Sequence, residues 1–417
     1  MNREGALRAF NHRNYRILFP ASVLSNIGTW AQRIAQDWLV LELTGSAQLL
    51  GLVTALQFLP SLLLSLYGGV LADRFDKRTL LMLTNIGAGV GSLVMGLLVV
   101  TGVVQIWHVA LLAFVVGVFS ALDAPVRTSF NSELVGKSDI PSAISLNSAN
   151  FNAGRLIGPA ASGLLIVLFG TGVSFIINSL TYVVVVIALS MMQREKLFIE
   201  AKPDTSAKLK QAVQYVLRHR EMKLVMIAVF FATTFGLNFQ IFMAVMATKE
   251  FGLGPAEFGL LGSILAVGSF TGVLVSARLE HLRVPKFVMA GGIMFGMLLT
   301  IAAWMPNYGS FAAILPILGG VALLTLISAN SYVQTNSDPK LRGRVMGIYL
   351  LIFMGGTPIG SPLIGLFAEA VGIRWAIFAC GVVVLIASSI IYFLLVRNPG
   401  QDPITEGLPV IPEPNVQ

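Results

Sequence analysis

Four polar residues recur at helical spacing near the start of the chain: Asn26, Thr29, Arg33 and Asp37. Separations of three or four residues place side chains on one face of a helix. The segment around them is apolar, so this face is expected to border a polar cavity or a partner helix instead of lipid. A buried carboxylate can carry a proton, because burial penalises its charged form unless a cation is close. Asp37, with Arg33 one turn away, is therefore the first candidate for proton coupling.

Two interpretations of Asp37 stay open. In the functional one, proton binding weakens the attraction to Arg33 and biases a conformational change. In the structural one, the two residues form a fixed ion pair. A second polar face is expected later in the chain, and its Arg155 is a further candidate for proton coupling. The face consists of Ser145, Ser148, Asn152, Arg155, Pro159 and Ser162.

Asp123 is the next carboxylate within an apolar segment, and Arg127 follows it by one helical turn. This spacing favours a local ion pair over a proton site. The uncharged residues that we expect to line a substrate cavity are Asn26, Thr29, Gln32, Gln36, Asn152, Phe235, Asn238, Gln240, Asn330 and Gln334. Hydrogen bonds between helices explain the amides of the second half equally well, and phenylalanines at helical spacing more often serve packing.

The sequence has no pattern of residues that is typical of an enzyme active site or a metal site. The four histidines are scattered, the lone Cys380 can form no internal disulfide, and no Gly-x4-Gly-Lys-Ser/Thr phosphate loop occurs. We therefore expect no enzyme, no cofactor and no metal. The energy source for any transport is then an ion gradient, with protons as the default ion.

The composition places these residues in a membrane. Of 417 residues, 55% are hydrophobic and only 12% are charged, and the mean hydropathy is +0.80. Apolar segments of about 20 residues must be helices, since lipid offers no partner for backbone groups. We predict an all-α integral membrane protein with twelve transmembrane helices at 15–43, 47–71, 79–101, 105–128, 142–168, 172–193, 223–248, 256–279, 286–305, 309–334, 344–368 and 374–397.

Most of the 28 Lys and Arg residues fall before the first span or after every second span. The positive-inside rule then predicts that both termini are cytoplasmic. It also accounts for the net charge of +8 without a nucleic-acid partner. The predicted units are an N-terminal six-helix bundle (1–193), a cytoplasmic linker (194–222), a C-terminal six-helix bundle (223–397) and a disordered cytoplasmic tail (398–417).

The linker contains a basic amphipathic pattern. Its apolar positions, predicted to share one helical face, are Leu209, Val213, Val216 and Leu217. Lys208, Lys210, Arg218 and Arg220 surround this face, which predicts a helix lying on the anionic inner leaflet of the bilayer.

The two predicted bundles repeat weakly, which makes them pseudo-symmetric. Gly154, Gly158 and Gly163 recur as Gly356, Gly360 and Gly365, each 202 residues later. Internal duplication is typical of secondary transporters, which bind substrate between the halves near the membrane midplane.

The loop Gly69-Val70-Leu71-Ala72-Asp73-Arg74-Phe75-Asp76-Lys77-Arg78 resembles the signature loop of the major facilitator superfamily. The resemblance implies that Asp73 and Arg74, supported by Arg78, latch the two halves on the cytoplasmic side in the outward-facing state. Asp76 stands where the family usually has Gly. Both residue types tolerate left-handed backbone geometry, so we expect the turn to survive.

The segment Gly154-Arg155-Leu156-Ile157-Gly158-Pro159-Ala160-Ala161-Ser162-Gly163 resembles the motif of export-type members of this superfamily. Its key residues here are Gly154, Gly158, Pro159 and Gly163. The match is partial, because Ser145 and Ser162 replace two glycines of the full pattern. Small residues of this kind also permit close helix packing whatever the function.

The segments Asn14-Tyr15-Arg16, Asn26-Ile27-Gly28-Thr29-Trp30 and Gln36-Asp37-Trp38-Leu39-Val40 resemble a bacterial branch that includes exporters of enterobactin-type siderophores and multidrug exporters. The resemblance covers nearly the whole chain and names no substrate. It implies a monomeric, proton-coupled exporter of small amphiphilic compounds in the bacterial inner membrane. The alternatives are a transport-inactive sensor of the same fold, an importer or a lipid-moving transporter.

Overall fold

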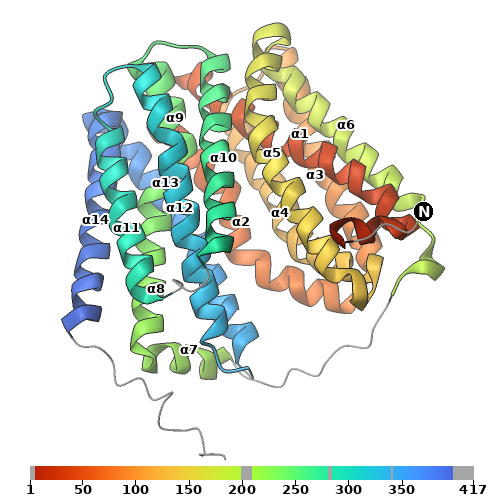
Figure 1. Ribbon diagram of the computed structural model, residues 1–417. Coiled ribbons are helices and arrows are strands. Elements are labelled where there is room, and N and C mark those ends of the chain that lie inside the picture. The colour runs from red at the N-terminus through yellow and green to blue at the C-terminus, as the bar shows by residue number, and fades with distance from the viewer. Residues whose placement is uncertain (1–4, 199–208, 280–283, 340, 398–417) are drawn as a thin grey trace, which may run out of the picture.

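The computed structural model describes residues 5–198, 209–279, 284–339 and 341–397, and within these ranges the chain is helical without strands (Figure 1). The predicted tail 398–417 lies outside the described residues. The long helices are α1 (Arg13–Thr44), α2 (Ala47–Arg74), α3 (Lys77–Val100), α4 (Ile106–Val135), α5 (Ile140–Phe169), α6 (Thr171–Ser190), α10 (Pro255–Arg278), α11 (Pro285–Ala302), α12 (Tyr308–Thr335), α13 (Arg342–Val371) and α14 (Ile373–Arg397). The short elements are η1 (Gly5–Asn11), η2 (Lys137–Asp139), η3 (Arg194–Lys196), α7 (Leu209–Arg218), α8 (Arg220–Phe231), η4 (Ala232–Gly236), α9 (Phe239–Val245) and η5 (Met246–Glu250).

Eleven segments of the described chain are long and apolar enough to cross a membrane. These segments overlap the predicted spans from the second to the twelfth. The first predicted span corresponds to α1, which is 32 residues long but does not reach the same hydropathy. The chain is thus a multi-pass membrane protein. The twelve-span arrangement in two bundles, with both termini in the cytoplasm, stays a prediction.

The helices form two groups, an N-terminal group (α1–α6) and a C-terminal group (α8–α14), which lie side by side in Figure 1. We call the end at which α2 meets α3 and α4 approaches α5 the basic end, because Lys77, Arg78 and Lys137 lie there. At the opposite end, the turns after α1 and α13 are made by Gly45 and Gly372 with φ of 62° and 91°. These left-handed conformations suit glycine, which lacks a Cβ.

Asp76 has a different role from the one predicted. Its φ of −62° and ψ of 114° are extended, not left-handed. It is the N-cap of α3, where its carboxylate accepts hydrogen bonds from Thr79 N (3.1 Å) and Thr79 Oγ1 (2.6 Å). Partial burial acts to raise the pKa of Asp76, but these bonds and the charges of Arg194 and Arg78 outweigh it and lower the pKa.

The predicted span 223–248 is not one continuous helix. It is divided into α8, the π-helical turn η4, the short helix α9 and the π-helical turn η5. Between η4 and α9, Leu237 and Asn238 leave helical geometry. Such irregular backbone at membrane depth is tolerated where it borders a cavity or packs within protein.

The predicted amphipathic helix of the linker is α7, and it lies at the basic end of the C-terminal group (Figure 1). The predicted single apolar face is divided. Val216 is buried together with Ala212, whereas Val213 and Leu217 are exposed. The side chain of Leu209 lies outside the described set.

Two helix crossings join the groups near the opposite end. In the first, α5 meets α10, where Gly163 is against Pro255 and Ala256, and Gly259 is against the Pro159 carbonyl. In the second, α13 meets α2, where Gly365 is against Ala47 and Gly51 is against the Ser361 carbonyl. Gly163 and Gly365 are partners in the sequence repeat, so the repeat marks equivalent contacts in the two groups.

Candidate functional site

A cavity of about 210 Å³ lies between the two groups of helices. Residues of α1, α2 and α5 line it on one side, and residues of the broken segment, α10 and α13 line it on the other. We call it the central cavity. Both crossings contribute to its wall, through Pro159 and Gly262 in one and through Phe58 and Thr357 in the other.

The ionisable side chains that line the central cavity are Arg33 and Arg155. The Cζ atom of Arg33 lies 4.7 Å from the ring centroid of Trp30 and 5.3 Å from that of Phe58. The Cζ atom of Arg155 lies 5.8 Å from the same Trp30 ring. Both guanidinium groups thus interact with the face of one indole. The structure therefore brings together two of the predicted charged residues and makes the cavity electropositive.

Several buried polar atoms around the central cavity have no hydrogen-bond partner. These are Nε of Arg33, Oδ1 of Asn238 and Nε2 of Gln240. Arg155 donates to Ser269 Oγ over 3.4 Å, which is a long contact. Because buried polar groups are usually paired, these donors and this acceptor are suited to water or a ligand.

Asp37 is close to this cavity without lining it. It is 2% exposed, and its Oδ2 atom has no hydrogen-bond partner. It is one helical turn from Arg33 on α1. A carboxylate in this position is either ionised and attracted to Arg33 or protonated and neutral. The arrangement is compatible with proton binding.

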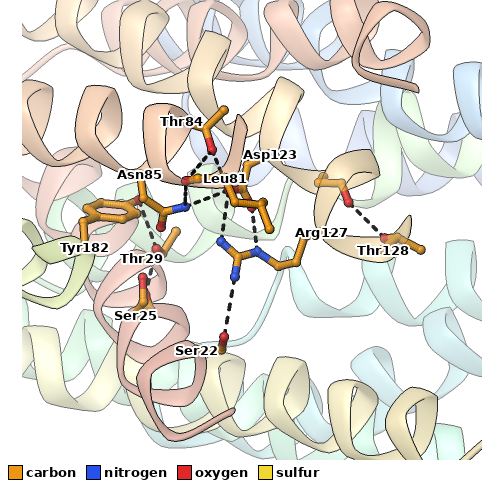
Figure 2. A network of polar contacts seen from close by, with 11 residues as sticks. Ser22, Ser25, Thr29, Leu81, Thr84, Asn85, Asp123, Arg127, Thr128 and Tyr182 are labelled. Carbon is orange, nitrogen blue, oxygen red and sulfur yellow. Dashed lines mark hydrogen bonds and ion pairs between the residues drawn. The ribbon is translucent and has the colours of Figure 1, made fainter. Parts of the chain in front are cut away.

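A second cavity, of about 310 Å³, lies within the N-terminal group, and most of the residues that line it have polar side chains; we call it the polar cavity. Asp123 and Arg127 of α4 line it and form an ion pair within a network of polar contacts (Figure 2). Arg127 Nε donates to Asp123 Oδ2 (2.6 Å), and Arg127 Nη2 donates to Oδ1 (3.0 Å). Thr84 Oγ1 and Asn85 Nδ2 donate to the same Oδ1 at 2.8 and 2.9 Å. Asp123 is thus held in a saturated structural network, which differs sharply from the situation of Asp37.

Arg33 lines the polar cavity as well as the central cavity. Two of the predicted cavity residues, Asn26 and Thr29, line the polar cavity too. Asn26 Nδ2 donates to the Asn150 carbonyl (2.7 Å), and the Thr29 hydroxyl is 3.2 Å from the Tyr182 hydroxyl. Arg33 therefore lies where the two cavities approach each other.

The other predicted cavity residues line neither cavity, and most of them have structural partners. Gln32 accepts a bond from Asn178 Nδ2 (2.6 Å), and Gln36 donates to Gln57 Oε1 (3.3 Å). Asn152 donates to the carbonyl of Ser148 within its own helix. Phe235 stacks on Phe231, Asn330 is beside the Tyr349 hydroxyl, and Gln334 is exposed near the end of α12.

The glycines of the helix-5 motif serve packing. A Cβ added at Gly154 or Gly158 would meet Asn26 or Trp30 of α1, and Gly163 contacts α10. Pro159 lines the central cavity. The motif therefore packs α5 against one helix of its own group and one helix of the other group.

The latch residues are placed as follows. Arg78 Nη2 donates to the Ser190 carbonyl (2.8 Å), which ties α3 to α6 within the N-terminal group. Arg74 is exposed. The side chain of Asp73 lies outside the described set, so its predicted role stays a prediction.

Sequence reasoning missed Thr84, Asn85 and Tyr182 in the polar cavity, and Trp30 between the two arginines. The sequence does contain a pattern that could have identified Thr84 and Asn85. The predicted third span carries Thr84, Asn85, Ala88 and Ser92 at helical spacing, which is a polar and small face in an apolar helix. Trp30 has no comparable signal, because a tryptophan in an apolar span usually packs.

A family model described as transmembrane secretion effector matches residues 4–417. The chain is 24% identical to the staphyloferrin A transporter of Staphylococcus aureus over 381 residues, which are 91% of this chain and 96% of that protein. It is 24% identical to the multidrug efflux pump Tap of Mycolicibacterium fortuitum, over 91% of this chain and 94% of the pump. It is 20% identical to the enterobactin exporter EntS of Salmonella choleraesuis, over 85% of each chain.

The fold resembles solved transporter structures. A bacterial homologue of the human lysosomal transporter Spinster, inward-facing and unoccupied, aligns with a TM-score of 0.74 and 16% identity over 92% of this chain and 96% of that chain. The nucleoside transporter NupG aligns with a TM-score of 0.69 and 13% identity, over 92% and 98% of the two chains. At these identities the likeness concerns the fold alone.

Proposed function

The chain belongs to the transmembrane secretion effector family of the major facilitator superfamily, and on that premise we propose that it is a secondary active exporter of small amphiphilic compounds. It exchanges them for protons by alternating access. The observation that carries this proposal is the central cavity, lined by both groups of helices and adjoined by the crossings at the opposite end. A substrate site between two repeated halves is the usual arrangement of secondary transporters.

Export is supported by the names of the relatives, which include an exporter and an efflux pump. The helix-5 motif supports the same direction. Siderophore-like metabolites and drugs are the substrate classes that those names suggest. Arg33 and Arg155 repel cations from the central cavity, so neutral or anionic compounds are the better ligands.

Asp37 is the proposed proton carrier. Its unpartnered Oδ2 atom and its burial beside Arg33 distinguish it from Asp123, whose oxygens are saturated. Proton binding removes the negative charge one turn from Arg33 and so changes the balance between conformations. The protein acts as a monomer in the bacterial inner membrane with both termini inside, and Asp73 and Arg74 latch the basic end in the outward-facing state.

The test is transport by the purified protein in liposomes that contain a pH-sensitive dye. A gradient is imposed of ethidium, tetraphenylphosphonium, a catecholate chelator or a hydroxycarboxylate chelator, one compound at a time. The wild type is compared with Asp37→Asn and with the control Glu195→Gln, which makes the same chemical change at an exposed residue. We expect proton movement opposite to at least one compound in the wild type and the control, reduced at least tenfold in Asp37→Asn.

Equal proton movement in Asp37→Asn and the wild type, at equal folding, would exclude Asp37 as the carrier. Compound movement without any proton movement would refute proton exchange and leave transport itself intact. A protein that moves none of the compounds behaves as the transport-inactive sensor would.

A further inference from the structure

An apolar groove of about 310 Å³ lies at the basic end of the C-terminal group. Three short stretches form it: Val213, Val216 and Leu217 of α7, Lys223 to Phe230 of α8, and Ile348 and Ile352 of α13. Its lining is apolar apart from one charged residue, Lys223. It is separate from both cavities described above.

The groove presents large apolar side chains that the protein leaves uncovered. Leu217 is 58% exposed, Val213 is 41% exposed and Ile227 is 39% exposed. The helices α8 and α13 belong to candidate membrane spans, whereas α7 is only ten residues long. An apolar hollow of this kind does not hold water well, and hydrocarbon is the neighbour that matches it.

Positive charge surrounds the α7 side of the groove. Lys210 and Arg218 are exposed on α7, and Lys223 lines the groove itself. The nearest acidic residue along the chain, Glu221, accepts a hydrogen bond from the Tyr332 hydroxyl (3.0 Å) and does not line the groove. Basic residues beside a membrane span attract anionic lipid headgroups.

We propose that this groove is a binding site for an anionic phospholipid. One acyl chain lies between α7, α8 and α13, and the headgroup phosphate contacts Lys223 with the basic residues of α7 nearby. The lipid fastens the linker helix to α13, which forms one of the two crossings between the groups. This site is independent of the transported substrate, and it stands whether or not the proposed export is correct.

The test is native mass spectrometry of the full chain, titrated with phosphatidylglycerol or with phosphatidylcholine of the same acyl chains. We expect one phosphatidylglycerol to be retained at least tenfold more tightly than phosphatidylcholine. Lys223→Gln removes one charge contact and reduces this preference about fivefold. Lys286→Gln, an exposed lysine at the start of α11, is the matched control and leaves the preference unchanged. Leu217→Asp puts a carboxylate at the groove and abolishes retention of both lipids, whereas Leu217→Ile preserves it.

Equal retention of the two lipids by the wild type would overturn the proposal. A lipid preference equal to that of the wild type in Lys223→Gln would also overturn the proposal. An unchanged unfolding temperature of Lys223→Gln shows that the variant is folded.

Discussion

Asp37 and Asp123 are carboxylates of the same group of helices with opposite surroundings. Asp123 accepts bonds from Arg127, Thr84 and Asn85, so both its oxygens are used. Asp37 has an oxygen with no partner. A residue whose charge is fully compensated stabilises one structure, and a residue whose charge is not compensated can respond to its conditions. The two therefore suit different roles, the first in stability and the second in coupling.

Asp123→Ala is expected to destabilise the protein by about 2–3 kcal/mol, because it leaves the guanidinium of Arg127 without a counterion at a site that is mostly buried. The double change Asp123→Leu with Arg127→Met is expected to destabilise the protein less than Asp123→Ala does, since no unpaired charge is left. Thermal unfolding in detergent measures both. Arg194→Gln is the control, because its pair with Asp76 is 67% and 49% exposed and should contribute less than about 1 kcal/mol. A double variant less stable than Asp123→Ala would show that Arg127 is held by other contacts.

At the residue scale, the sequence predicted contacts within one helix better than contacts between helices. The four-residue spacing of Asp123 and Arg127 predicts their ion pair, because one helix fixes it. Contacts between helices depend on how the helices pack, which one sequence does not reveal. Thus Gln32 and Gln36, predicted to line a cavity, bond instead to Asn178 and Gln57.

At the scale of elements, the two groups of helices contact each other closely at glycine residues. Gly163 at the first crossing and Gly365 at the second allow one backbone to touch another. Only small residues permit two helix backbones to come this close. Close packing of this kind stabilises helix association in lipid. The sequence repeat at these positions predicted duplication, but the partner helices α10 and α2 became known only from the structure.

Gly163→Leu is expected to reduce transport at least tenfold by preventing closure of the first crossing. A Cβ at this position would lie 2.7 Å from the Pro255 carbonyl oxygen and 3.0 Å from Ala256 Cα, and overpacking of this kind costs about 1–3 kcal/mol. The liposome assay measures the rate. Gly347→Leu on α13 has nothing within 4 Å of the added Cβ and should transport normally. Normal transport by Gly163→Leu would mean that the crossing need not close during the cycle.

The spans were predictable because lipid imposes both their length and their polarity. The break in the predicted span 223–248 was not predictable in this way. Gly236 precedes the break and is a poor helix former, but glycines such as Gly91 and Gly117 lie within continuous helices, so glycine alone does not predict the interruption at Leu237 and Asn238. The divided face of α7 was not predictable either, since Val216 packs into the protein while Leu217 remains exposed.

At the scale of the whole molecule, the distribution of charge predicts the orientation in the membrane. The positive-inside rule predicts that the basic end faces the cytoplasm. Phe75 lies in a loop at the basic end, and Val103 lies in a loop at the opposite end, and both are exposed. The native Cys380 is buried, so a new cysteine at either loop can be labelled selectively.

In intact cells, a membrane-impermeant maleimide is therefore expected to label Val103→Cys and to leave Phe75→Cys unlabelled. Inverted vesicles should give the reverse pattern, and the wild type should remain unlabelled in both. Mass spectrometry of the purified chain detects the adduct. Labelling of Phe75→Cys in intact cells would place the basic end outside and would contradict the proposed direction of export.

The two glycine crossings also have a mechanical consequence. Two points of close contact define a line, and while both crossings are closed, rotation of one group about that line changes the separation of the basic ends. The helices that cross there are long levers: α5 and α13 have 30 residues each, which correspond to about 45 Å. A pivot near one end of such a lever converts a small angular change into a large displacement at the other. The glycines thus act as a hinge axis for the basic ends while the crossings are closed, and opening of the cavity to the opposite end requires the same glycine contacts to separate.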